Sequence, residues 1–110
     1  MSNKEVAKKY IEFFCSGEIE KLSVLLSPDL FFSGTFFIFH SAKEYLDNLR
    51  KNPPEKCNHK IISITENEDS IAIFYEYQKP EKTLPVAQLF KIKNQKIQEV
   101  LLVFDGRVLT

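Results

Sequence analysis

The amino-acid sequence predicts an α+β protein in which helices come first and an antiparallel sheet follows. In the first half of the chain, apolar residues recur at helical spacing between capping signals. From His59 onward the period changes to two, and short turns separate four runs of strand length. Helices followed by a meander of strands are typical of an α+β layer architecture. With 110 residues, 44% of them hydrophobic, we expect residues 1–110 to form one domain around one core.

A capping box and a glycine bound the first expected helix. Ser2 and Glu5 have the Ser-x-x-Glu spacing of a helix start, and Gly17 is expected to end the helix. A second, short helix is expected over Glu18–Leu26, because Pro28 prevents its continuation. The first helix carries one apolar stripe with i, i+4, i+7 and i+8 spacing, formed by Val6, Tyr10, Phe13 and Phe14.

An aromatic-rich segment and a third helix follow. Leu30–Phe39 is expected as two extended pieces separated by a bend at Ser33-Gly34-Thr35. Ser41 then starts a helix with a second capping box to Glu44, and Asn52-Pro53-Pro54 ends it. These elements complete the expected helical layer.

The second half of the chain predicts four antiparallel strands. Their expected bounds are Lys60–Thr65, Ser70–Gln78, Thr83–Lys93 and Lys96–Phe104. Two of the later strands are apolar on both faces, whereas a sheet with one face in water alternates cleanly. The helices can cover the concave face of the sheet. We therefore expect a homodimer in which the convex faces of two sheets pack against each other. The alternative is that Leu89, Leu101 and Val103 are scattered apolar residues on the surface.

Composition excludes several classes of partner. Fifteen basic and fifteen acidic residues cancel, which leaves no electrostatic signature for nucleic acid or an anionic membrane. No apolar run approaches the roughly 20 residues of a membrane span. The N-terminus is polar, and the two cysteines, Cys15 and Cys57, lack metal-ligand spacing and are too few for a disulfide framework. We therefore expect a cytoplasmic protein without a metal or other cofactor.

The order of elements and three local segments resemble a known group of proteins. The segments are Tyr10–Asp29, His40–Leu49 and Gln88–Phe104, and the closing Phe104-Asp105-Gly-Arg107-Val-Leu109 looks like a Phe-Asp-x-Arg strand end. They resemble the SnoaL-like and ketosteroid isomerase-like families of the nuclear transport factor 2-like superfamily. The resemblance implies a cone-shaped α+β barrel of the cystatin-like type. In such a cone the N-terminal helices pack in a curved, mostly antiparallel sheet with a pocket at its open end.

The resemblance also implies a site that lacks one catalytic group. In ketosteroid isomerases a tyrosine and a protonated acid form an oxyanion hole, and an aspartate moves the proton. By the helix–Gly–helix spacing, Tyr10 falls on the tyrosine position, Gln88 on the acid position and Gly34 on the position of the base. A phenol and a carboxamide can both donate to a carbonyl oxygen. Without a base they cannot abstract a proton from carbon.

Two polar and several apolar residues are therefore candidates for a ligand site. Tyr10 and Gln88 either contact a ligand or form hydrogen bonds inside the core. His40 and Asp105 are the candidate acid–base residues; the alternatives are a histidine bonded to backbone and an ion pair of Asp105 with Arg107. Ten Phe and four Tyr residues exceed what a small core needs. We expect five of these aromatic side chains and one valine to form the walls of the pocket: Phe14, Phe32, Tyr75, Phe90, Val100 and Phe104.

Three functions stay open at this point. The first is a protein that binds a small hydrophobic or carbonyl-bearing ligand in its pocket without acting as an isomerase. The second is a diverged isomerase, cyclase or dehydratase that uses Tyr10 with His40 or Asp105. The third is a structural dimerisation domain whose aromatic side chains fill the cone. An open cavity would exclude the third, and an acid or base inside the cavity would favour the second.

Overall fold

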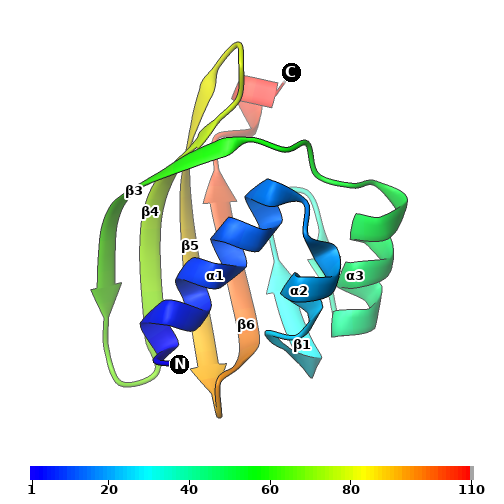
Figure 1. Cartoon of the computed structure of the whole chain (residues 1–110), viewed down its shortest axis with the longest axis vertical. Helices are drawn as coiled ribbons and strands as arrows, with labels where there is room; N and C mark the ends of the chain where they lie inside the picture. Colours follow the sequence, from blue (N-terminus) through cyan, green and yellow to red (C-terminus); the bar gives the residue numbers. More distant parts are fainter. Residues whose placement is uncertain (110) are drawn as a thin grey trace.

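Three α-helices lie against one face of a six-stranded sheet (Figure 1). The computed structural model describes the backbone of residues 1–109 and the side chains of residues 1–107; Thr110, the last residue of the expected domain, lies outside the described residues. The elements in chain order are α1 (Asn3–Ser16), α2 (Ile19–Ser23), β1 (Leu26–Ser33), β2 (Ile38–Phe39), α3 (Ala42–Lys51), β3 (Asn58–Glu66), β4 (Ser70–Gln78), β5 (Thr83–Lys93), β6 (Lys96–Phe104) and the 3₁₀ turn η1 (Gly106–Leu109).

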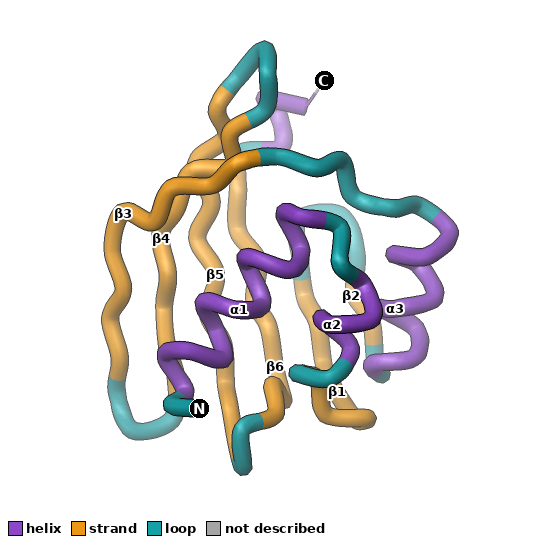
Figure 2. The backbone as a smooth tube through the Cα atoms, viewed as in Figure 1, coloured by secondary structure: helices purple, strands orange, loops and turns teal. Residues whose placement is uncertain are grey.

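The sheet has the strand order β2-β1-β6-β5-β4-β3. Only β1 and β6 run parallel, and the other neighbours are antiparallel. The sheet curves around the helices and does not close, as the tube in Figure 2 shows. Helix α1 packs on β3, β4 and β6, and α3 packs on β1 and β2. The predicted α+β cone with a curved, mostly antiparallel sheet is thereby confirmed.

Both predicted helix starts are present. The Ser2 Oγ accepts a hydrogen bond from the Glu5 backbone N–H at 3.2 Å, and the Glu5 carboxylate accepts one from the Ser2 N–H at 3.4 Å. At α3, the Ser41 Oγ accepts from the Glu44 N–H at 3.1 Å. The Glu44 carboxylate there accepts from the N–H of His40 and not of Ser41. The two serine hydroxyls each satisfy a backbone donor that the first helical turn leaves without a partner.

The end of α1 also follows the sequence. Gly17 has φ of +73°, the left-handed conformation in which glycine carries little penalty. The Glu18 N–H donates to the Phe13 carbonyl at 2.9 Å, which closes the helix end. This turn sets the angle at which the chain leaves α1 for α2.

The second helix is shorter than the predicted range Glu18–Leu26. Helix α2 ends at Ser23, and β1 begins at Leu26, so Pro28 lies inside a strand. The Ile97 N–H donates to the Leu25 carbonyl at 2.8 Å, and Leu26 pairs with Ile97 of β6. The β1–β6 register shifts between Leu26 and Phe31, and such an irregularity tolerates a proline without an N–H. Pairing with a distant strand thus overrides the local helical pattern.

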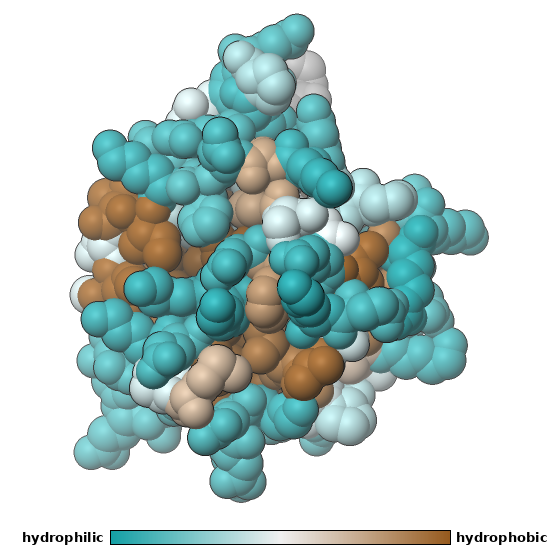
Figure 3. Space-filling view, in the orientation of Figure 1, coloured by the Kyte–Doolittle hydropathy of each residue, from teal (hydrophilic) through white to brown (hydrophobic). Residues whose placement is uncertain are grey.

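The period of two places side chains on two distinct faces of β4, β5 and β6. On the concave face, Ile73, Gln88 and Val100 are buried against the helices. On the convex face, Phe74 and Val103 are each 53% exposed. Seen from the helix side, most of the surface is hydrophilic, with an apolar patch over the edge strand β3 (Figure 3). None of the helices within residues 1–109 combines the length and the apolar character needed to cross a bilayer.

Candidate ligand-binding cavity

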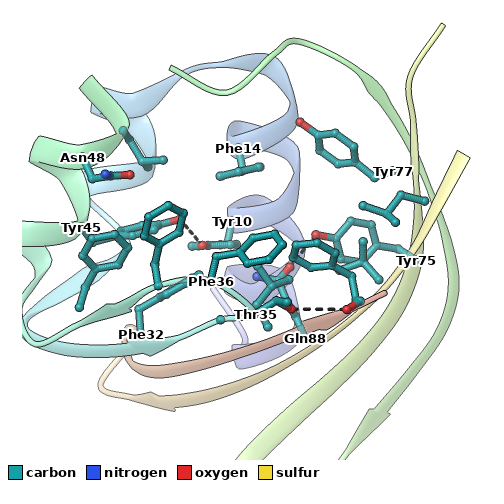
Figure 4. Close-up of a pocket in the computed structure, with 18 of the residues that line it drawn as sticks. Tyr10, Phe14, Phe32, Thr35, Phe36, Tyr45, Asn48, Tyr75, Tyr77 and Gln88 are labelled. Carbon is teal, nitrogen blue, oxygen red and sulfur yellow. Dashed lines mark hydrogen bonds between the residues drawn. The ribbon is translucent and has the colours of Figure 1, made fainter. Parts of the chain in front are cut away.

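A cavity of about 300 Å³ lies between α1, α3 and the concave face of the sheet (Figure 4). Most of its lining is aromatic, and all four tyrosines of the chain contribute to it. The aromatic lining residues are Tyr10, Phe14, Phe32, Phe36, Phe37, Phe39, Tyr45, Tyr75, Tyr77 and Phe104. The others are Gly34, Thr35, Asn48, Leu49, Lys79, Leu84, Val86, Gln88 and Leu102. The space between the helices and the sheet is therefore not filled by side chains.

Two hydrogen-bonded pairs form the buried polar part of this lining, in addition to Thr35, Asn48 and Lys79. The hydroxyl of Tyr10 on α1 meets the hydroxyl of Tyr45 on α3 (Figure 4). The Tyr75 hydroxyl donates to Gln88 Oε1 at 2.7 Å. Tyr75 and Gln88 are diagonal neighbours on adjacent strands, because Gln88 lies opposite Ile73, two residues before Tyr75. The helical stripe and the strand period thus aim all four side chains inward.

The three deeply buried phenols are held in their neutral form. Burial is the largest cause that raises the pKa of Tyr10, and hydrogen bonds from Tyr45 and Gln88 offset part of that rise. Burial also raises the pKa of Tyr45 and of Tyr75, and in both cases proximity to Tyr10 adds to it. A neutral phenol keeps its proton and donates hydrogen bonds. The cavity consequently offers uncharged donors and no stable phenolate.

The three positions carried over from the resemblance meet at this cavity. Tyr10 and Gln88 are only 2% and 4% exposed, and both line it. Gly34, which stands where a base would be, lines it too. A Cβ atom at Gly34 would lie 3.0 Å from Cε1 of Phe32, so the ring fills part of the space of a missing side chain. No Asp, Glu, His or Cys is among the described residues that line the cavity.

Four of the six expected wall residues line the cavity, and two do not. Phe14, Phe32, Tyr75 and Phe104 are lining residues. The prediction is wrong for Phe90 and Val100, which lie in the closed core at 0% and 2% exposure. The Phe90 ring packs edge-on against Tyr10, with 5.2 Å between ring centroids. The strand period predicts the face of a side chain but not its depth along the strand, and α1 covers this part of the sheet.

Neither candidate acid–base residue reaches the cavity. His40 is exposed, its ring lies 5.5 Å from the Phe31 ring, and its backbone N–H donates to Glu44. Asp105 is exposed and forms a two-pronged ion pair with Arg107, with 2.9 Å from Nε to Oδ1 and 2.7 Å from Nη2 to Oδ2. This pairing lowers the pKa of Asp105. Asp105 therefore has the ion-pair role that we considered as its alternative. His40 has a different role, because its ring lies beside Phe31 and its backbone N–H bonds the Glu44 side chain.

Sequence reasoning missed several residues of the cavity. Tyr45 is not among the expected site residues, yet it is the hydrogen-bond partner of Tyr10. The loop between β1 and β2 folds over the cavity, because the Thr35 Oγ1 donates to the Phe104 carbonyl at 3.4 Å and Phe36 packs edge-on against the Phe104 ring. The only available signal was the bend at Ser33-Gly34-Thr35, which does not say where the loop folds.

The described residues do not form a metal centre. Within residues 1–107, no three His, Cys, Asp or Glu side chains are grouped closely enough to hold an ion. The cavity also lacks the charged lining that would neutralise a highly charged cofactor, since Lys79 is its single charged lining residue among those described. The described lining offers neutral hydrogen-bonding groups, aromatic and aliphatic surface, and the ammonium group of Lys79.

Comparisons with known proteins match at the level of the fold. No model of a protein family matches the sequence, and no curated protein matches it either. An NTF2-like protein of unknown function from Burkholderia pseudomallei K96243 has a TM-score of 0.82 and 15% identity, covering 99% of this chain and 95% of that chain. A proposed SnoaL-like polyketide cyclase from Shewanella putrefaciens CN-32 has a TM-score of 0.81 and 15% identity, covering 99% and 84%. A proposed ketosteroid isomerase from Kribbella flavida DSM 17836 has a TM-score of 0.81 and 14% identity, covering 94% and 77%.

These similarities identify the fold. The chain has the nuclear transport factor 2-like fold, as the resemblance to SnoaL-like and ketosteroid isomerase-like proteins implied. At 14–15% identity the residues of the neighbours do not transfer to this chain. Its function has to be argued from its own cavity.

Proposed function

We propose that this protein binds a small hydrophobic or carbonyl-bearing molecule in the cavity and does not act as an isomerase. One observation supports the proposal above the others: the described lining combines neutral hydrogen-bond donors and aromatic rings with no carboxylate or imidazole. A volume of about 300 Å³ is at the lower end of the range for small-molecule sites. Apolar walls with few polar groups are the usual form of such a site.

The hydrogen-bond network supports a ligand with an acceptor oxygen. Either Tyr10 or Tyr45 donates in this pair, and the hydroxyl that accepts still has its own proton to donate. A ligand carbonyl near this pair would accept that hydrogen bond, and its apolar body would pack on Phe14 and Phe32. Such donors also stabilise negative charge that develops on an oxygen. Proton abstraction from carbon needs a positioned base in addition, and Gly34 does not supply one.

The first experiment looks for a retained ligand. The protein is purified from its own host, and native mass spectrometry compares its mass with that of the denatured chain. We expect a small bound molecule that is lost in Tyr10→Phe and Gln88→Leu. Gln98→Leu is the matched control, because Gln98 is on β6 and does not line the cavity. Retention of the ligand in both cavity variants would contradict the proposed contacts.

A second experiment separates binding from catalysis. Exchange of the hydrogens beside the carbonyl of a bound ketone with deuterated water reports proton abstraction. We expect no acceleration by the wild-type protein and a gain in Gly34→Asp, which restores a carboxylate at the base position. The backbone φ of Gly34 is not positive, and the new side chain requires only a small shift of the Phe32 ring. Acceleration by the wild-type protein would favour the alternative of a diverged enzyme.

We also propose that the convex face of the sheet forms a homodimer interface. The strand register aligns apolar side chains across β4, β5 and β6, and the next row, Lys91 and Glu99, is an ion pair at 3.7 Å. An apolar centre with a polar rim is the usual anatomy of an interface. The two apolar rows consist of Phe74, Ala87 and Val103, and of Ala72, Leu89 and Leu101.

A cytoplasmic location and a single domain over residues 1–110 complete the proposal. Two cysteines are too few for the disulfide framework that is typical of small secreted domains.

A further inference from the structure

The fold brings the two cysteines of the chain together. Cys15 is on the last turn of α1, and Cys57 directly precedes β3. The Cys57 N–H donates a hydrogen bond to the Cys15 carbonyl at 3.0 Å. Both cysteines line one open recess on the surface, together with Glu12, Ser16, Asn58, His59 and Gln78. This recess is separate from the ligand cavity, and the two sets of lining residues do not overlap.

The backbone hydrogen bond limits the distance between the two cysteines. The carbonyl oxygen and the amide nitrogen are each fixed by covalent geometry relative to their own Cα, so the two Cα atoms are at most about 7 Å apart. Disulfides span Cα distances of roughly 4.4–6.8 Å, and cysteines further apart than about 7 Å cannot be bridged without backbone movement. The hydrogen bond therefore keeps the two Cα atoms within about the distance that a disulfide can span.

The two thiols differ in their access to solvent. Burial raises the pKa of the Cys15 thiol, and the neighbouring Cys57 thiol raises it further. Cys15 is only 2% exposed, whereas Cys57 is half-buried. A small oxidant from solvent thus reaches Cys57 first, and Cys15 is the nearest thiol to it.

The described residues that line the recess are not grouped as the ligands of a metal ion. Cys15, Cys57, His59 and Glu12 all line it, yet no three of the described ligand-type side chains converge. A pair of thiols without further ligands is left, and its characteristic chemistry is oxidation.

We propose that Cys15 and Cys57 are an oxidisable pair that closes into an intramolecular disulfide in the folded protein. With a hydroperoxide as oxidant, the Cys57 sulfur attacks one peroxide oxygen, the O–O bond breaks, and Cys57 becomes a sulfenic acid while an alcohol or water leaves. The Cys15 sulfur then attacks the Cys57 sulfur, the S–O bond breaks, and hydroxide leaves to take the Cys15 proton as water. The two thiols lose two electrons and two protons, and the peroxide is reduced.

The bridge would lie directly behind one wall of the ligand cavity. The Cys57 thiol lies close enough to Tyr77 to raise the pKa of its phenol, after burial as the largest cause. The Tyr77 ring lies 6.3 Å from the Phe14 ring, and both rings line the cavity. Phe14 precedes Cys15 in the chain. The disulfide therefore ties the α1 side of this wall to the β3–β4 side and closes a loop that contains α2, β1, β2 and α3.

The test uses the reduced full-length protein and hydrogen peroxide as the probe. We expect both thiols to disappear together, with a mass loss of two hydrogen atoms and a peptide that joins the segments around residues 15 and 57. The product stays a single chain on a non-reducing gel. Its melting temperature rises by about 10 °C, which is typical for a bridge across a long loop in a small domain, and dithiothreitol reverses the rise.

Two variants serve as controls. Cys57→Ser and Cys15→Ala each keep one thiol, so neither gains stability with peroxide. Independent loss of the two thiols, a Cys57 that stops at the sulfinic acid, or a disulfide between two chains would each overturn the proposal. None of these readouts requires a ligand in the cavity, so the result does not depend on the proposed function.

Discussion

Raising the pH should unfold this protein together with the ionisation of its buried tyrosines. The pKa values of Tyr10, Tyr45 and Tyr75 all lie above the ordinary value of 10.0, with burial as the largest cause. Above pH 10 the phenols of the unfolded chain lose their protons while those of the folded chain keep them. The stabilisation is therefore complete below pH 10 and is lost as the pH rises beyond it.

The magnitude follows from the number of protons that the folded state retains. Each retained proton lowers the free energy of unfolding by about 1.4 kcal/mol for each pH unit above 10. For the three deeply buried phenols the slope is about 4 kcal/mol per pH unit. A domain with a typical stability of about 5–15 kcal/mol then unfolds between about pH 11 and pH 13.5, toward the lower end if its stability is low. Tyr77 is left out of this estimate because it is only half-buried.

The assay follows tyrosinate absorbance and far-ultraviolet circular dichroism in one alkaline titration. We expect the two signals to change together, with little tyrosinate before the fold is lost. The Tyr45→Phe variant should reduce the slope of stability against pH by about one third. Ionisation of three or more phenols near pH 10 in a protein that keeps its circular dichroism would refute the reasoning, because those phenols would then be in contact with water.

Three further predictions concern the cavity, the convex face and the end of α1. Tyr75→Phe and Gln88→Leu should each cost about 1–3 kcal/mol in urea unfolding, because each leaves a buried polar atom unpaired, and the double variant should cost less than their sum. Strict additivity would contradict the hydrogen bond. Val103→Lys should weaken a homodimer by about tenfold or more in light scattering, with Lys91→Ala at the rim as the neutral control; a wild-type protein that stays monomeric would contradict the interface. Gly17→Ala should lower stability by about 1 kcal/mol, since its φ is +73° while the new Cβ would meet only the Lys56 side chain at 3.5 Å; unchanged stability would mean that the turn relaxes.

The elements with strong local signals were predicted closely. The expected bounds of β4, β5 and β6 are those of the structure. Their signals act between residues that are close in the sequence. They are the alternation of apolar residues, the tight turn at Asn94-Gln95 and the two capping serines. Both turn residues have positive φ, as a two-residue hairpin turn requires. Local chemistry is sufficient for such elements because the partners are close in the chain.

Failures of prediction occurred where a distant partner decides the conformation. Leu26 has a helical pattern, yet it pairs with Ile97 and starts a strand. Phe90 and Val100 have the correct face for a cavity wall, but α1 covers them. Tyr45 is one apolar residue among several on its helix, and only the packing of α3 beside α1 makes it the partner of Tyr10.

By itself, the sequence determined the α+β order, the capped helices, the two faces of the sheet, and the inward direction of Tyr10 and Gln88. These follow from periods of 3.6 and 2 residues and from capping groups, which act over a few positions. Tertiary structure alone decided which inward residues border empty space, how their hydroxyls pair, and that Cys15 meets Cys57. Those contacts join segments far apart in the chain, and their geometry depends on how whole elements pack.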